Sequence, residues 1–225
     1  MLLKRKAYGS LLKWKTECKG TKAILIEGAR RIGKSTVCKE FGKNEYKSCL
    51  LIDFARAGTN IREYFENYLN DLDTFFMLLS TAYGQRLYER ESLIIFDEVQ
   101  MYPKAREAIK YLVADGRYDY IETGSLISIR ENVKDIVIPS EERRLKMHPL
   151  DFEEFAWSMG EDILVEYMKR CFEKREIPER EMHNKAMLLF KQYMLVGGMP
   201  KSVVLYLENK KDFEAADREK RDILE

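Results

Sequence analysis

The chain has 225 residues, of which 45% are hydrophobic and 34% are charged, with 39 Lys and Arg against 38 Asp and Glu. This composition is that of an ordinary soluble protein, and a net charge of +1 indicates no particular partner. A globular chain of this length buries about 70% of its unfolded surface, so it can form a substantial core.

The cysteines and the apolar runs exclude several classes of protein. The four cysteines form no Cys-x-x-Cys pair and only two histidines accompany them, so the spacing indicates no zinc cluster. No apolar run approaches the roughly 20 residues that a membrane span needs, and the first residues are too charged for a signal peptide. We therefore expect reduced thiols, a cytoplasmic location and no membrane partner.

The first 22 residues are locally basic, with seven Lys or Arg and one Glu. The same segment spaces Leu3, Ala7, Leu11 and Trp14 as one face of a helix. We favour a helix with a solvated basic side. Contact of the basic side with nucleic acid or with an acidic protein is the alternative.

Short runs of branched apolar residues alternate with helical patterns through the first two thirds of the chain. Five runs predict strands, the last of them weakly, at residues 22–28, 49–55, 92–99, 118–125 and 144–150. Helical patterns lie between them at residues 35–41, 61–88 with a break near 70–73, and 103–115, where Pro103 suits a helix start. This alternation predicts an α/β fold, a parallel sheet flanked by helices.

The pattern changes after Pro149, because the remaining segments show helical periodicity and almost no strand signal. Asp151 is a candidate helix cap, with Phe152 and Phe155 on the buried side, and Gly197, Gly198 and Pro200 predict a tight break. We therefore expect a core at residues 1–150 and a smaller all-helical region at 151–225. That region ends in mid-pattern, so we expect it to be truncated at its C-terminus.

The stretch from Ile26 to Thr36 has the pattern G-x-x-x-x-G-K-[ST], between a predicted strand and a predicted helix. In such a loop the backbone N–H groups turn around a phosphate, and the helix N-terminus adds positive potential. Lys34 can then reach the β and γ phosphates, and the Ser35 hydroxyl can bind Mg²⁺. The predicted nucleotide contacts are Gly28, Ala29, Arg30, Arg31, Ile32, Gly33, Lys34, Ser35 and Thr36. Solvated or structural roles are favoured for the two arginine side chains.

Two later strand ends supply groups for hydrolysis. Asp97 ends a buried run at the carboxyl edge of the sheet, and Glu98 follows it. We assign Asp97 to Mg²⁺, either as a direct ligand or through a bound water, and Glu98 to activation of the attacking water. Thr123 or Ser125, in the next strand end, is a candidate to contact the γ-phosphate or the water. Gln100 is either a further group that orients water or a simple turn residue.

An arginine often neutralises charge in the transition state of phosphoryl transfer. The candidates in this sequence are Arg130, Arg143 and Arg144, with a surface role favoured for each.

The order of these motifs resembles the prokaryotic AAA-type ATPases, grouped with archaeal-like P-loop ATPases, that carry a C-terminal domain of unknown function. The matching segments run nearly end to end: "LKRKAYGSLLKWK", "EGARRIGKST", "IIFDEVQ", "ETGS", "HPLDFEEF" and "VGGMP". The resemblance implies a P-loop NTPase core with a Walker A loop at Gly28 to Ser35, a Walker B at Asp97 and Glu98, and a sensor-like turn at Thr123 to Ser125. It also implies a following lid or winged-helix-like region.

The leading hypothesis is therefore a Mg²⁺-dependent ATPase that couples hydrolysis to a conformational change. The alternative is a nucleotide-dependent binding module or switch with little hydrolysis. DNA, a protein partner and a homo-oligomer all stay open as further partners.

Overall fold

The computed structural model describes residues 2–125 and 141–224. The chain forms two compact units and crosses from one to the other twice. One unit, called here the sheet unit, contains residues 7–147; the other, the helical unit, contains residues 1–6 and 148–225. The predicted division into a core at residues 1–150 and a helical region at 151–225 stays a prediction.

The sheet unit is built on five parallel strands in the order β2-β3-β4-β1-β5. Their bounds are β1 Ala23–Gly28, β2 Ser48–Asp53, β3 Ser92–Asp97, β4 Asp119–Ser125 and β5 Glu142–Lys146. Every residue of β1, β3 and β4 is buried, as expected for the interior strands of a covered parallel sheet. The predicted α/β fold with a parallel sheet is therefore confirmed.

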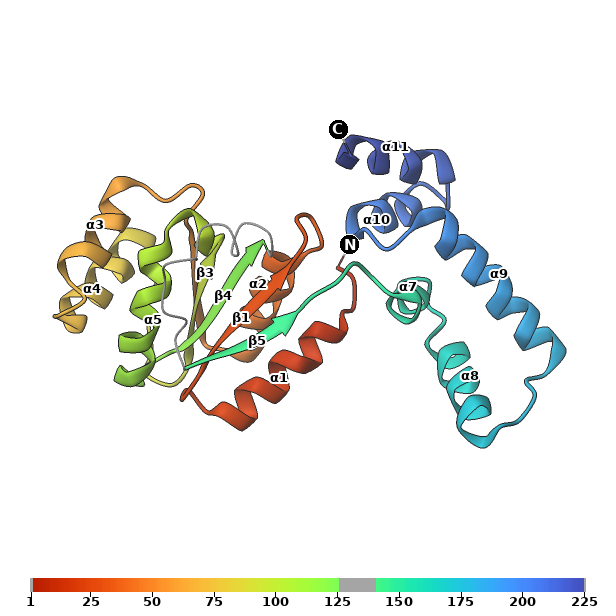
Figure 1. Cartoon of the computed structure of the whole chain (residues 1–225), viewed down its shortest axis with the longest axis horizontal. Helices are drawn as coiled ribbons and strands as arrows, with labels where there is room; N and C mark the ends of the chain where they lie inside the picture. The colour runs from red at the N-terminus through yellow and green to blue at the C-terminus, as the bar shows by residue number, and fades with distance from the viewer. Residues whose placement is uncertain (1, 126–140, 225) are drawn as a thin grey trace. The chain divides into compact units, whose positions relative to one another are not determined.

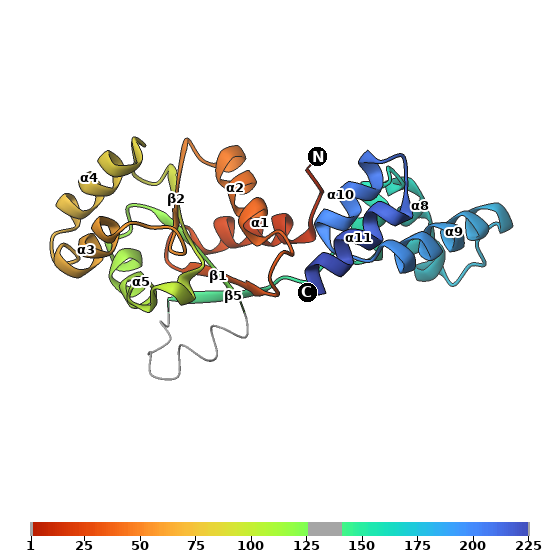
Figure 2. The ribbon, with the colours of Figure 1, turned by 90° about the horizontal axis from the view of Figure 1, so that it is seen from above.

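Helices cover both faces of this sheet (Figure 1). Helices α1 (Lys6–Cys18) and α2 (Lys34–Glu45) lie on one face, and α3 (Thr59–Asn67), α4 (Leu72–Tyr83) and α5 (Pro103–Asp115) lie on the other. A short 3-10 helix, η1 (Val99–Met101), joins β3 to α5. Figure 2 shows the same two layers from above.

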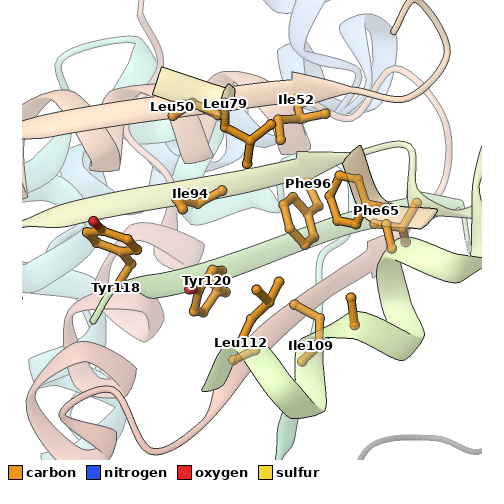
Figure 3. Packing of buried hydrophobic residues seen from close by; sticks show 14 of the residues in the cluster. Leu50, Ile52, Phe65, Leu79, Ile94, Phe96, Ile109, Leu112, Tyr118 and Tyr120 are labelled. Carbon is orange, nitrogen blue, oxygen red and sulfur yellow. The ribbon is translucent and has the colours of Figure 1, made fainter. Parts of the chain in front are cut away.

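The main core of the sheet unit lies between the strands and helices α3, α4 and α5. Side chains from β2, β3 and β4 meet Phe65 of α3, Leu79 of α4 and Leu112 of α5 (Figure 3). Phe65 packs edge to face on Phe75 and Phe96, with ring centroids 5.0 and 5.5 Å away. This aromatic packing fixes β3, the strand that ends at Asp97.

Several predicted boundaries are corrected. The helix predicted over residues 61–88 is two helices, α3 and α4, as the expected break near 70–73 implies, but α4 ends at Tyr83. Gly84 ends it by taking the left-handed conformation at φ +61°, from which its N–H bonds the carbonyls of Ser80 and Thr81. Strand β5 begins two residues earlier and ends four residues earlier than the weak pattern indicated.

The helical unit contains five helices among its described residues: α7 Phe152–Ser158, α8 Asp162–Lys174, α9 Arg180–Val196, α10 Pro200–Glu208 and α11 Phe213–Leu224. Asp151 caps α7 through a capping box, because its carboxylate accepts from the Glu154 N–H while Glu154 accepts from the Asp151 N–H. Phe155 is fully buried behind the cap and Phe152 packs beside the core. The expected cap is confirmed.

Two segments of the helical unit that lie far apart in sequence contact each other through their backbones. The Leu150 N–H donates to the Gly198 carbonyl at 2.7 Å. A Cβ at position 198 would lie only 2.2 Å from the Leu150 carbonyl oxygen. Only glycine fits there. The segments "HPLDF" and "VGGMP" therefore have one structural role, which is to form this close backbone contact.

The first residues belong to the helical unit. The Arg5 guanidinium pairs with Glu154 at 3.2 Å, with both side chains buried, and also donates to the His148 carbonyl. Leu3 packs into the core of the same unit. The expectation that Leu3 continues the helix face of Ala7, Leu11 and Trp14 is therefore wrong, since α1 begins only at Lys6.

Among the residues that the structure describes, no helix has the length and apolar character to cross a bilayer.

Candidate nucleotide-binding site

The loop between β1 and α2 has the backbone that an anion cradle requires. Gly33 lies at the N-cap of α2 with φ +89°, a conformation that glycine adopts without a steric penalty. Arg31 is also left-handed, with φ +65°. These turns place the first N–H groups of a twelve-residue helix at the carboxyl end of β1.

Gly28 closes the base of the loop against β5. The Met147 N–H donates to the Glu27 carbonyl at 2.8 Å, continuing the contact of β1 with β5. A Cβ on Gly28 would come within 2.3 Å of the Met147 carbonyl oxygen and 2.7 Å of Ile32 Cδ1. The first glycine of the motif is thus required by close packing.

Lys34 extends along the inside of the loop. Its ammonium donates to the carbonyls of Gly28 and Ala29, at 3.1 and 2.7 Å, and only 6% of the residue is exposed. Burial lowers the pKa of Lys34, while the carboxylates of Glu98 and Asp97 act in the opposite direction. A buried cation held at the mouth of an N–H cradle is suited to a polyanionic ligand.

Ser35, Asp97 and Thr123 form a hydrogen-bonded chain beneath the loop. The Ser35 hydroxyl donates to Asp97 Oδ1 at 2.8 Å, and the Thr123 hydroxyl bonds the same oxygen. The strand order explains the meeting, because β4 lies between β1 and β3 and brings Thr123 next to Asp97. Parallel strands present their carboxyl ends at one edge, where ligands bind in open α/β sheets.

Glu98 is held by its neighbours on both backbone and side chain. It is left-handed with φ +56°, and its N–H donates to Thr123 Oγ1 at 3.3 Å. Its carboxylate Oε2 accepts from the Gln100 amide. Glu98 is half-buried, whereas Asp97 is 6% exposed, so the two adjacent carboxylates have different surroundings.

The other predicted residues lie around this centre in different environments. Ser125 is buried and stands opposite Gly28 in the β1–β4 register. Ile32 is buried under the loop, while Ala29, Arg30, Arg31 and Thr36 are exposed. The structure thus gathers Lys34, Ser35, Asp97, Glu98 and Thr123 and leaves the loop arginines at the surface.

The candidate arginines are placed as follows. Arg143 pairs with Glu17 at 2.6 Å, and Arg144 pairs with Glu142 at 3.2 Å. Both belong to β5 and are exposed. Arg130 lies outside the described residues.

The donor set fits Mg²⁺ and a nucleoside triphosphate. Mg²⁺ takes hard oxygen ligands and commonly combines one or two protein oxygens with substrate phosphates. The touching Ser35 hydroxyl and Asp97 carboxylate offer such oxygens directly below the loop. Three or more His, Cys, Asp or Glu side chains do not cluster as a metal site in the described part of the chain. Phosphate oxygens and water would therefore complete the coordination.

Sequence reasoning missed two features near the site. One is the hydrogen bond from the Gln100 amide to the Glu98 carboxylate. The sequence feature that could have indicated it is the spacing of the two residues, i and i+2, in a tight turn. The other is a buried cluster on the sheet, in which Arg106 of α5 forms a bidentate pair with Glu142 beside the fully buried Glu122. No spacing in the sequence links those three positions.

The parallel sheet, the glycine-bounded loop and the acidic strand end define the fold of a P-loop NTPase. A family model described as an AAA domain matches residues 20–156. The match spans more than half of the chain, and the chain belongs to this family. No curated protein sequence matches the chain.

Two solved structures are similar in fold. One is the Aeropyrum pernix ORC1 protein in complex with DNA, with a TM-score of 0.46 and 12% identity over 87% of this chain and 68% of that one. The other is Drosophila ORC bound to GC-rich DNA and Cdc6, with a TM-score of 0.41 and 14% identity over 82% of this chain and 76% of that one.

Proposed function

We propose that this AAA-domain protein binds ATP with Mg²⁺ and hydrolyses it, and that the cycle changes the conformation of the chain. The single observation that carries the proposal is the Ser35–Asp97–Thr123 hydrogen-bonded chain beneath the loop, with Glu98 bonded to the same threonine. A loop that only turned the chain would need neither the buried Asp97 nor the buried Thr123 at that edge of the sheet.

Each side chain has a role that follows from its position. Lys34 and the loop N–H groups bind the β and γ phosphates. Ser35 and Asp97 would hold Mg²⁺, which neutralises charge on the phosphate oxygens when bound. Glu98, half-buried beside them, accepts the proton of the attacking water. The Thr123 hydroxyl holds the Asp97 carboxylate and the Glu98 N–H in place, and Ser125 is the second hydroxyl at the same edge.

The test compares the wild type with Glu98→Gln and Lys34→Ala in Mg²⁺-dependent phosphate release and in ATP binding. We expect Glu98→Gln to bind ATP while losing about 10² to 10⁴ in turnover, the usual contribution of a general base. Lys34→Ala should lose binding itself. Wild-type protein that neither binds ATP nor hydrolyses it above the Lys34→Ala level would overturn the proposal.

A nucleotide-dependent switch with little hydrolysis is the second candidate. It is supported by the two described candidate arginines, since Arg143 and Arg144 are paired with acids of their own chain. An arginine from a neighbouring subunit would then be needed for fast turnover. ATP binding without turnover in both the wild type and Glu98→Gln would favour this candidate.

The further partners remain part of the proposal. We propose a cytoplasmic protein that engages a protein, a second copy of itself or DNA, with the basic first helix as the DNA contact. Binding to a DNA duplex that weakens steeply with added salt would support the last. Absent binding, or binding indifferent to salt, would exclude it.

A further inference from the structure

Gln100 is a buried polar residue beside the proposed base. It lies in η1, directly after Glu98, and is 5% exposed. Its amide nitrogen donates to Glu98 Oε2, while its own carbonyl Oε1 is buried with no hydrogen-bond partner among the described residues. A carboxylate can only accept, so the chemistry fixes which end of the amide faces Glu98.

This arrangement destabilises the fold. A buried carbonyl without a partner costs about 1–3 kcal/mol relative to one that is satisfied. A leucine of similar size would avoid that cost. An unsatisfied buried group of this kind needs a reason, and among the described residues the side chain of Gln100 has the Glu98 carboxylate as its hydrogen-bond partner.

The turn that carries Gln100 is rigid. The Met101 N–H donates to the Glu98 carbonyl at 2.9 Å, and the Tyr102 N–H donates to the Val99 carbonyl at 3.1 Å. Val99 is 1% exposed and packs in the main core. Since the backbone on both sides of Gln100 is fixed, its amide holds the Glu98 side chain at a fixed place.

The contact leaves half of the carboxylate available. Gln100 takes Oε2 of Glu98, and Oε1 accepts no hydrogen bond from the described residues. Thr123 fixes the Glu98 backbone at the same time. One oxygen is therefore anchored and the other can accept from a water.

We infer that Gln100 is a positioning residue for hydrolysis, which orients the Glu98 carboxylate toward the attacking water. This inference rests on the proposed ATPase activity and assigns to it a residue that acts through the base. Loss of orientation at a reacting group costs up to about 10²-fold in rate.

The test is a double-mutant cycle in single-turnover ATP hydrolysis, with wild type, Gln100→Leu, Glu98→Gln and the double variant. We expect Gln100→Leu to lower the rate about 10- to 100-fold with unchanged ATP affinity. In the Glu98→Gln background it should have no further effect, because the group through which it acts is gone.

Thermal unfolding separates positioning from a structural role. Gln100→Leu removes the unsatisfied oxygen, and water can replace the amide at the half-buried Glu98, so the melting temperature should stay the same or rise while the rate falls. Gln100→Glu, which has no donor and places two carboxylates together, should also be slow. Gln85→Leu, the same change in the loop after α4, is the matched control and should leave the rate unaltered.

The outcomes are separable. Wild-type protein that binds ATP without turnover would overturn the proposed hydrolysis and this inference together. Normal or faster turnover in Gln100→Leu, or an equal loss in both backgrounds of the cycle, would overturn the role of Gln100 alone. A rate that falls only together with the melting temperature would likewise make Gln100 structural.

Discussion

The two compact units treat buried polar groups differently. In the helical unit the buried charges Arg5 and Glu154 are paired with each other, and Ser202 carries the one unsatisfied buried side-chain atom among its described residues. In the sheet unit several buried polar atoms have no hydrogen-bond partner among the described residues, among them Gln100 Oε1 and the Tyr120 hydroxyl. Among the described residues, the unpartnered buried polar atoms are thus concentrated in the sheet unit, where each lowers the stability of the fold.

Two tryptophans make this comparison measurable. Trp14 lies in α1 of the sheet unit, 1% exposed, with its indole N–H bonded to the Lys22 carbonyl at 2.8 Å. Trp157 lies in α7 of the helical unit, with the Lys4 ammonium 4.4 Å from the ring centroid. Since the chain has only these two, Trp157→Phe and Trp14→Phe give proteins whose fluorescence reports one unit each.

The largest expected effect comes from breaking the buried ion pair in each unit. Arg106→Met takes the buried partner from Glu142 and leaves it the exposed Arg144, and Arg5→Met strands Glu154 in the helical unit. Each should lower the free energy of unfolding by about 3–5 kcal/mol, with the smaller loss for Arg106→Met because Arg144 still offsets part of the buried charge. Denaturant unfolding followed by the tryptophan of the same unit measures the loss.

Lys4→Met is the control for that pair of variants. Lys4 and Asp162 form an exposed ion pair, with side chains 64% and 43% accessible, so its loss should cost less than about 1 kcal/mol. Equal losses for Lys4→Met and Arg5→Met would show that the buried position of the Arg5 pair does not matter.

The next effect concerns the two glycines that touch a backbone carbonyl. Gly28→Ala and Gly198→Ala both place a Cβ against main-chain oxygen, at 2.3 and 2.2 Å, and each should destabilise its unit by about 1–3 kcal/mol. ATP binding, followed with a fluorescent analogue, should be lost only in Gly28→Ala. Loss of nucleotide binding in Gly198→Ala would show that the distinction between the units is false.

Glu122 should make the stability of the sheet unit depend on pH. Burial, and then the negative Glu142, raise the pKa of Glu122 well above its ordinary 4.5, while Arg106 acts in the opposite direction. The native state therefore holds a proton that the unfolded state releases. Stability is greatest below the unfolded pKa and falls as pH rises toward the folded one, by at most about 1.4 kcal/mol per pH unit.

Glu122→Gln tests this dependence, because the amide is neutral at every pH. Urea unfolding of the Trp14 reporter between about pH 5 and pH 8 should show a smaller fall in stability for the variant than for the wild type. Parallel curves for the two proteins would mean that Glu122 is ionised in the native state.

The smallest effect is a gain. Gly9 lies inside α1 and a Cβ there meets nothing within 4 Å, so Gly9→Ala should stabilise the sheet unit by about 0.5–1 kcal/mol. Gly116→Ala is the matched control, since it also has space but has φ +77°, and it should destabilise. A gain in both would contradict the backbone argument. Thermal melts of the Trp14 reporter resolve the sign.

The sequence predicted the parts of the molecule that depend on local pattern. The strands that end at Gly28, Asp97 and Ser125 follow from branched apolar runs, and the helix cap at Asp151 follows from its place before a helical pattern. The strand order did not follow, and it is this order that brings Thr123 to Asp97. Glu122, Arg106 and Glu142 come from three separate elements, so only tertiary structure joins them. Leu3 was assigned to α1 by periodicity, but tertiary packing places it in the other unit.

The chain passes from the helical unit to the sheet unit and back, and this limits how the protein can be cut into fragments. Because residues 1–6 belong with residues 148–225, no single cut releases both units intact. A fragment that begins at His148 lacks Leu3 and the Arg5 partner of Glu154, and a hexapeptide supplied in trans would have to restore them. Fragment complementation by that peptide is therefore the natural assay for the autonomy of the helical unit.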